Sequence, residues 1–220
     1  MKRRPEPELM DSEAQTLAYA EADFDEANTL FTDRFRAHFE PLPDKGRMAD
    51  LGCGPGDIAM RMARVLPGWH VTGLDAGENM LRRARERLSG SGLESRVEFR
   101  LSYLPDDSLE PGGWDAVISN SLLHHLPDPQ VLWTSIHRIG APEAAVQVMD
   151  LLRPPDEAEA QLLVERYAAD APGILREDFY NSLLAAYTPE EIRDQLVRAG
   201  LDRLKILTAS DRHWIVYGRL

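Results

Sequence analysis

Three glycines alternate at positions 52, 54 and 56, between a short apolar run and an amphipathic segment. Glycine has no Cβ, so this arrangement is typical of a strand-to-helix turn that brings the backbone against a ligand. In the dinucleotide-binding pattern G-x-G-x-x-G, the third glycine stands where this chain has Asp57. A carboxylate at a helix N-terminus repels a pyrophosphate and favours a cationic ligand, such as a sulfonium with a free amino group.

A second carboxylate, Asp75, closes the next predicted strand, 19 residues beyond Gly56. At this position an acidic side chain can accept hydrogen bonds from both ribose hydroxyls of an adenosine. Asp75 therefore indicates an adenosine-containing cofactor, although it does not separate a sulfonium cofactor from a nicotinamide one.

Two histidines, His124 and His125, follow the predicted strand over residues 115–120. Either can act as a general base for an acceptor that starts protonated, or the pair can have a positioning or structural role. Asp150 and Arg153 follow the next predicted strand, where they would contact a charged substrate or pair with each other.

Aromatic residues mark two segments outside the regular pattern. Tyr19 lies in the N-terminal arm, residues 1–45, and Tyr180 lies in an insertion over residues 155–187. Aromatic side chains in such segments exclude water and shape an acceptor pocket, or they pack the segment onto the sheet. Both tyrosines are therefore candidate substrate contacts.

Apolar runs of strand length alternate with amphipathic segments of helix length from residue 48 onward. This alternation predicts strands joined by crossover helices in a mainly parallel sheet, which is an α/β fold. The predicted strands span residues 47–51, 70–75, 97–101, 115–120 and 144–150, and a final hairpin spans 204–208 and 214–218.

The chain is expected to form a single domain with four parts. The N-terminal arm looks helical around residues 30–39, and the cofactor-binding core is predicted over 46–154. The helical insertion over 155–187 completes a cap, and residues 188–220 carry a capped helix and the hairpin. Thr188, Pro189 and Glu191 predict that helix, because they form a capping box with proline at the first helical position.

Four segments in order resemble the class I S-adenosylmethionine-dependent methyltransferase superfamily, and more narrowly its small-molecule branch similar to the ubiquinone and menaquinone biosynthesis methyltransferases. These segments are residues 50–57, residues 71–76 with Met80 and Leu81, residues 114–120 and residues 122–129. The resemblance implies a doubly wound, Rossmann-like sheet of seven strands in the order 3-2-1-4-5-7-6.

The resemblance also implies a role for each cofactor residue. Asp50 with the backbone of Gly52 and Gly54 would hold the methionine moiety, and Asn120 would lie beside the sulfonium. The remaining cofactor candidates are Asp75 for the ribose, Ala76 and Met80 for the adenine face, Cys53 and Asp57 in the turn, and Ser102 with Tyr103 at the adenine edge. Ser102 stands where the family usually has an acidic residue, and residues 140–143 lack the usual Pro-Gly-Gly turn.

Composition excludes several classes. A formal net charge of −12 disfavours a nucleic-acid partner, and no apolar run approaches the roughly 20 residues of a membrane span. The basic N-terminus precedes acidic residues rather than a signal sequence, so we expect a cytoplasmic protein. The lone Cys53 fits a space-filling role, and the histidines show no metal-ligand spacing, so we expect no metal.

The sequence thus predicts methyl transfer from S-adenosylmethionine to an O, N, S or C atom of a small molecule, with S-adenosylhomocysteine as product. Two alternatives stay open: a non-catalytic module that binds the cofactor as a sensor or partner subunit, and a nicotinamide-dependent oxidoreductase. The acceptor and the choice between monomer and homodimer are not indicated by any motif.

Overall fold

The computed structural model describes residues 1–6 and 11–220. Its sheet has seven strands in the order β3-β2-β1-β4-β5-β7-β6, which confirms the predicted topology. The strands are β1 (Gly46–Leu51), β2 (Trp69–Asp75), β3 (Val97–Leu101), β4 (Trp114–Asn120), β5 (Gly140–Leu151), β6 (Lys205–Thr208) and β7 (His213–Arg219). Strands β1 to β5 run parallel, whereas β7 is antiparallel to β5 and β6.

Strand β5 begins four residues earlier than predicted. Gly140 pairs with Trp114, but the next pair is Ala145 with Ala116, so the register shifts between them. Glu143 takes a positive φ of 65° within this irregularity. Residues 140–143 were predicted as a turn because the bulge interrupts the apolar alternation that marks the rest of the strand.

Helices connect the strands and also form the N-terminal arm and the insertion. They are α1 (Glu13–Glu21), α2 (Asp25–Phe39), α3 (Asp57–Val65), α4 (Glu78–Leu88), α5 (Gln130–Ile139), α6 (Glu157–Tyr167), α7 (Gly173–Ala185) and α8 (Pro189–Arg198), with a short 3₁₀ turn η1 (Leu123–His125). Both hydrogen bonds of the predicted capping box are present at Thr188 and Glu191. No described helix is long and apolar enough to cross a membrane.

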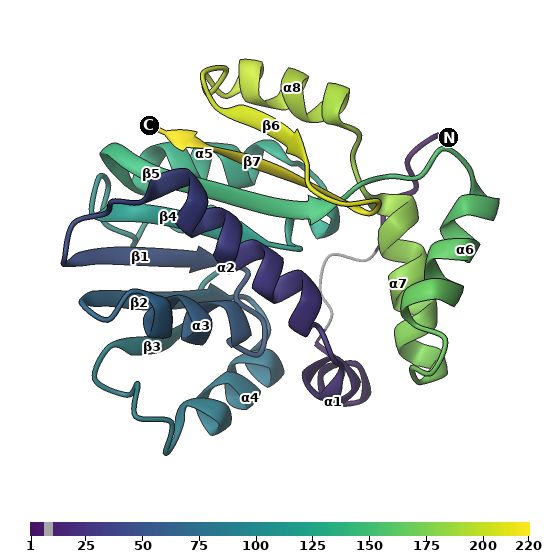
Figure 1. The fold of residues 1–220 in the computed structure, drawn as a ribbon, viewed down its shortest axis with the longest axis horizontal. Helices are drawn as coiled ribbons and strands as arrows, with labels where there is room; N and C mark the ends of the chain where they lie inside the picture. Colours follow the sequence, from purple (N-terminus) through teal and green to yellow (C-terminus); the bar gives the residue numbers. More distant parts are fainter. Residues whose placement is uncertain (7–10) are drawn as a thin grey trace.

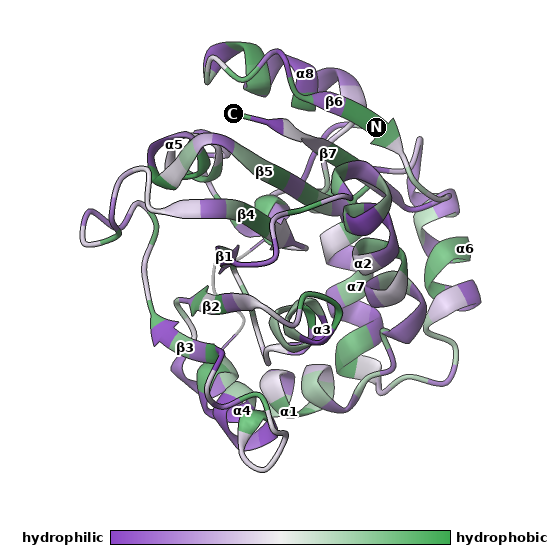
Figure 2. Ribbon diagram, turned by 60° about the vertical axis from the view of Figure 1, so that its left-hand side comes forward, coloured by the Kyte–Doolittle hydropathy of each residue, from purple (hydrophilic) through white to green (hydrophobic). Residues whose placement is uncertain are grey.

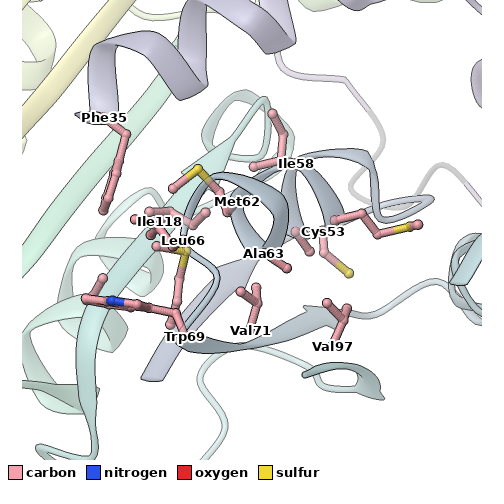
Figure 3. Close-up of a cluster of buried hydrophobic side chains, with 14 of the residues drawn as sticks. Phe35, Cys53, Ile58, Met62, Ala63, Leu66, Trp69, Val71, Val97 and Ile118 are labelled. Atoms are coloured by element: carbon pink, nitrogen blue, oxygen red, sulfur yellow. The ribbon is translucent and has the colours of Figure 1, made fainter. Parts of the chain in front are cut away.

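Two apolar layers enclose the sheet because neighbouring strand residues point to opposite faces. On β4, Ile118 joins the layer beneath α2, α3 and α4, whereas Val117 joins the layer that packs against α5 and α8. Figure 3 shows the first layer, in which Phe35 and Met62 approach Ile118 over the sheet. Hydrophobic residues accordingly concentrate along β5 and β7, while α4 presents many hydrophilic ones (Figure 2).

Helices α6 and α7 contact each other and have their own apolar cluster beside the sheet. They stand at the end toward which the arrows of β1 and β5 point, and α1 crosses the same end (Figure 1). Helix α1 contacts both α4 and α7. The carboxyl ends of the parallel strands, where α/β folds bind ligands, therefore open under helices of the arm and the insertion.

Candidate active site

A cavity of about 270 Å³ lies at the carboxyl ends of β1, β2 and β4. Its lining contains every residue predicted for the cofactor: Asp50, Gly52, Cys53, Gly54, Asp57, Asp75, Ala76, Met80, Ser102, Tyr103 and Asn120. We call these residues the cofactor wall. Strands β1 and β4 are adjacent in the sheet although they are not consecutive in the chain, so the cavity lies at the point where strand order reverses.

The glycine turn is held in a conformation that side chains rarely adopt. Gly54 has a φ of +50°, and a Cβ there would meet no atom within 4 Å, so its backbone faces open space. Gly56 has a φ of +83° and packs so closely on Phe99 that a Cβ would lie 2.4 Å from that ring. One glycine thus exposes backbone to a ligand, and the other seats the turn on the sheet.

Asp75 fastens this turn to the next strand. Its Oδ2 accepts a hydrogen bond from the Gly54 N–H at 2.8 Å, and its Oδ1 accepts one from the Gly77 N–H at 2.8 Å. Burial raises the pKa of Asp75, although these backbone donors oppose the rise. Each carboxylate oxygen keeps a further lone pair, so the residue can still accept hydrogen bonds from a ribose.

Three buried acceptor atoms on two residues of the cofactor wall lack a hydrogen-bond partner among the described residues. They are both carboxylate oxygens of Asp50 and the Oδ1 atom of Asn120. Burial raises the pKa of Asp50 to about 8, with a smaller contribution from Asp75. Buried polar atoms are seldom left unpaired, so this pair indicates a ligand that brings donors, such as an ammonium group.

The charge of Asp57 is largely compensated. Its Oδ1 accepts a hydrogen bond from Arg61 Nε at 2.5 Å, and Arg61 also pairs with Asp25 at 2.6 Å. The sequence argument against a pyrophosphate therefore depends less on Asp57 than predicted. Asp50 and Asp75 have no such cationic partner among the described residues, so their carboxyl groups are the ones with which a cationic ligand can pair.

At the adenine edge, Ser102 is buried and its Oγ donates a hydrogen bond to Asp106 Oδ2 at 2.7 Å. The lone pairs of the Ser102 oxygen stay available to an amino donor of a ligand. The acidic residue at this edge is Asp106, which accepts the hydrogen bond from Ser102. Tyr103 is 61% exposed at the cavity. Burial raises the pKa of Cys53 well above its usual value, which agrees with a space-filling role.

Another part of the lining comes from the N-terminal arm and from His125, and we call it the arm wall. It contains two aromatic residues of the arm, Tyr19 and Phe24, together with Ala20, Ala22 and Asn28, which the sequence did not single out. Burial raises the pKa of Tyr19 to about 12, so its hydroxyl stays protonated.

The arm is fixed to the cofactor wall by two long-range contacts. Arg87 of α4 donates to the Ala20 carbonyl at 2.9 Å. Asp11 Oδ1 accepts from the Asn79 N–H at 2.9 Å, and it thereby caps α4, whose own N-cap residue Gly77 offers no side chain. These partners are far apart in the chain, and no local pattern could have revealed them.

The two histidines have different surroundings. His125 lines the cavity, whereas His124 is buried behind it, with Nδ1 2.5 Å from Asp150 Oδ1. Burial would lower the pKa of His124, but the Asp150 carboxylate outweighs burial and the pKa is raised. Burial, followed by the charge on His124, lowers the pKa of His125 to about 3.

Three of the four predicted substrate residues lie outside the cavity lining. Asp150 is buried against His124, and Arg153 donates to Glu191 at 2.8 Å rather than pairing with Asp150. The Tyr180 hydroxyl donates to Glu157 within the pair α6 and α7. Partners elsewhere in the fold bond to the polar groups of these three residues.

Known methyltransferases resemble this chain in sequence. Residues 49–146 match the sequence model of a family described as "Methyltransferase domain". The chain is 29% identical over 181 residues to the 27-O-demethylrifamycin SV methyltransferase of Amycolatopsis mediterranei, covering 82% of this chain and 62% of that protein. It is 34% identical over 133 residues to the trans-aconitate 2-methyltransferase of Variovorax paradoxus, covering 60% of this chain and 48% of that one.

Among solved structures, a SAM-dependent methyltransferase from Aquifex aeolicus superposes with a TM-score of 0.69 at 16% identity, covering 93% of this chain and 97% of that one. This likeness and the strand order show the fold of class I S-adenosylmethionine-dependent methyltransferases, as the four sequence segments predicted. The chain spans less than two thirds of the length of these two curated relatives.

Proposed function

We propose that this protein transfers a methyl group from S-adenosylmethionine to a small-molecule acceptor and releases S-adenosylhomocysteine. The observation that carries the proposal is the pair of buried, unpartnered acceptors on the cofactor wall, Asp50 and Asn120, within the described residues. A cofactor with an ammonium group next to a sulfonium brings the donor and the positive charge that these acceptors lack.

Each part of the cofactor wall has a task in this proposal. Asp50 pairs with the ammonium group, and the exposed backbone at Gly54 lies along the methionine moiety. Asp75 accepts from the ribose, while Ala76, Met80 and Ser102 enclose the adenine. The sulfonium supplies an already activated methyl group, so the protein contributes mainly by aligning the acceptor with it.

The arm wall would align the acceptor. His125 and the protonated Tyr19 bring polar groups to the cavity, and buried His124 with Asp150 fixes the loop that carries His125. We assign His125 to contact with the acceptor, as a positioning group or a proton acceptor, and His124 to its support. The curated relatives named above act on a rifamycin and on trans-aconitate, which supports a small-molecule acceptor.

Calorimetric titration tests the cofactor half of this proposal. Wild-type protein should bind S-adenosylhomocysteine at micromolar concentrations and should bind neither NAD nor NADP. The nicotinamide alternative requires the reverse result. The Asp50→Asn variant should bind S-adenosylhomocysteine more weakly, whereas Asp107→Asn, which changes an exposed carboxylate, should not.

Turnover tests the transfer itself. Protein with radiolabelled S-adenosylmethionine should release S-adenosylhomocysteine faster when a set of small hydroxyl, amine and carboxylate compounds is supplied. Tight cofactor binding without transfer to any acceptor would favour the non-catalytic module instead.

A further inference from the structure

A second group of ligand-type side chains lies beside the cavity, behind His125. Glu6 of the N-terminal arm meets His124 and His125, and one ligand atom of each lies within 4.8 Å of the other two. Glu6 and His124 are buried, with side chains 8% and 3% exposed. The group combines two imidazoles with one carboxylate, which is a ligand set that proteins use for divalent metals.

The distances within this group fit a shared central atom. Glu6 Oε1 lies 3.2 Å from His125 Nδ1 and 3.5 Å from His124 Nε2. Metal bonds of about 2.0 to 2.1 Å in a tetrahedral arrangement separate the ligand atoms by about 3.3 Å.

The directions of these atoms agree with the distances. Although Glu6 is close to both rings, His125 Nδ1 is buried and has no hydrogen-bond partner among the described residues. No hydrogen bond joins Glu6 to His124 within that part of the chain either; Glu6 accepts from Ser182 instead. The ring nitrogens and the Glu6 oxygen lie close together without a hydrogen bond between them, so all of them can point at one bound cation.

The surroundings of His124 resemble the outer shell of a metal site. Metal-binding histidines usually donate their other ring N–H to a carboxylate, which fixes the tautomer and the ring orientation. His124 Nδ1 lies 2.5 Å from Asp150 Oδ1, so its Nε2 is the atom left to face Glu6 and His125. Asp150 is buried and also accepts from the Leu151 N–H, which holds it in place.

The charged groups around this point can accommodate a cation in place of a proton on His124. Glu6 and Asp150 place two carboxylates in a region from which water is excluded, and a proton on His124 offsets only one of them. The nearby Arg3 is directed at two carbonyl oxygens, those of Ala185 and His124. A divalent cation bound by neutral histidines would balance both carboxylates.

We propose that Glu6, His124 and His125 bind one divalent transition-metal cation of the zinc type, with Asp150 as the outer-shell partner of His124. The cation would tie the N-terminal arm to the histidine turn and so hold the arm wall closed. With Nδ1 of His125 on the cation, the N–H at Nε2 would be left as a donor, so His125 would position an acceptor. The sequence predicted no metal because Glu6 lies 118 residues from His124.

Metal titration of untagged protein tests this site. Protein stripped with EDTA and dialysed is titrated with Zn²⁺ by calorimetry, and with Co²⁺ by visible absorption. We expect one site per chain, a visible Co²⁺ band of four- or five-coordinate type, and a higher melting temperature with Zn²⁺. Glu6→Gln and His125→Gln should each weaken Zn²⁺ binding at least about 100-fold, and Asp150→Asn about 10- to 100-fold.

His137→Gln is the matched control, because it removes an exposed histidine from α5 and should leave Zn²⁺ binding unchanged. Absence of saturable Zn²⁺ and Co²⁺ binding by the wild-type chain would overturn the proposal, and so would folded Glu6→Gln protein that binds as tightly as wild type. If the variants unfold, the proposal is still tested by the wild-type protein, through the number of Zn²⁺ ions bound per chain and the Co²⁺ spectrum. S-adenosylhomocysteine binding is measured separately, so the cofactor proposal can fail while the metal site stands.

Discussion

The two walls of the cavity differ in how the chain builds them. The cofactor wall consists of short segments at strand ends, each fixed by bonds to its immediate neighbours, such as those from Gly54 and Gly77 to Asp75. The arm wall joins residues that are far apart in the sequence, such as Tyr19 and His125. Local geometry can specify a cofactor, whereas the acceptor side depends on how distant segments meet.

The largest effect is expected from the substitution that removes the proposed ribose acceptor, Asp75. Asp75→Ala should weaken S-adenosylhomocysteine binding about 100-fold or more, because hydrogen bonds to a charged group contribute about 1.5 to 3 kcal/mol each and the turn loses its anchor as well. Calorimetry measures the affinity, and circular dichroism checks the fold. Asp107→Ala on the surface is the control. Unchanged affinity in folded Asp75→Ala protein would show that the adenosine lies elsewhere.

A smaller effect is expected on the arm wall. His125→Ala should lower kcat about 10- to 100-fold, since a misplaced acceptor loses alignment with the methyl group, while S-adenosylhomocysteine affinity stays within about twofold. The control is His137→Ala on the exposed face of α5. Equal losses of kcat and of cofactor affinity would mean that the two walls are not separable, and the comparison between them would fail.

The same comparison explains what the sequence could predict. The α/β class follows from the alternation of apolar runs with amphipathic segments, and the spacing of Gly52, Gly54 and Asp75 indicates a ligand turn. The strand order and most of the cofactor roles were implied by the resemblance of four segments to a known superfamily. Arg153 shows the limit of local prediction. Its place after β5 predicted a substrate contact, but its guanidinium donates a hydrogen bond to Glu191 of α8. Asp11 shows it too, because an aspartate that caps a helix so far along the chain leaves no local signature.

Cofactor binding should depend on pH through Asp50. Its pKa of about 8 means that the empty protein holds this carboxyl mostly protonated at pH 7, and an ammonium ligand requires the carboxylate. Affinity should therefore rise by up to about tenfold per pH unit between pH 6 and 8, with release of close to one proton. Calorimetry at pH 7 in phosphate and in Tris detects the released proton as a difference between the two binding enthalpies. Asp50→Asn should remove that difference.

The same pKa has a consequence for stability, and its sign is opposite to that of a salt-bridged aspartate. Because the folded pKa of Asp50 lies above its ordinary value of 3.8, the empty fold binds the proton more tightly than the unfolded chain does. Asp50 therefore lowers the free energy of unfolding progressively as the pH rises from about 4 towards 8. Asp50→Asn should flatten that part of the pH–stability curve, and a curve of unchanged slope would count against a raised pKa.

The smallest effect is expected where the two walls join. Asp11→Ala removes a cap from α4, which typically costs about 1 kcal/mol, and loosens the arm next to Asp75. We expect a melting temperature lower by a few degrees and S-adenosylhomocysteine binding only about threefold to tenfold weaker. Glu21→Ala, an exposed carboxylate at the end of α1, is the control. A loss as large as that of Asp75→Ala would show that the arm is part of the cofactor wall, since a cap that acts only through the helix cannot cost that much.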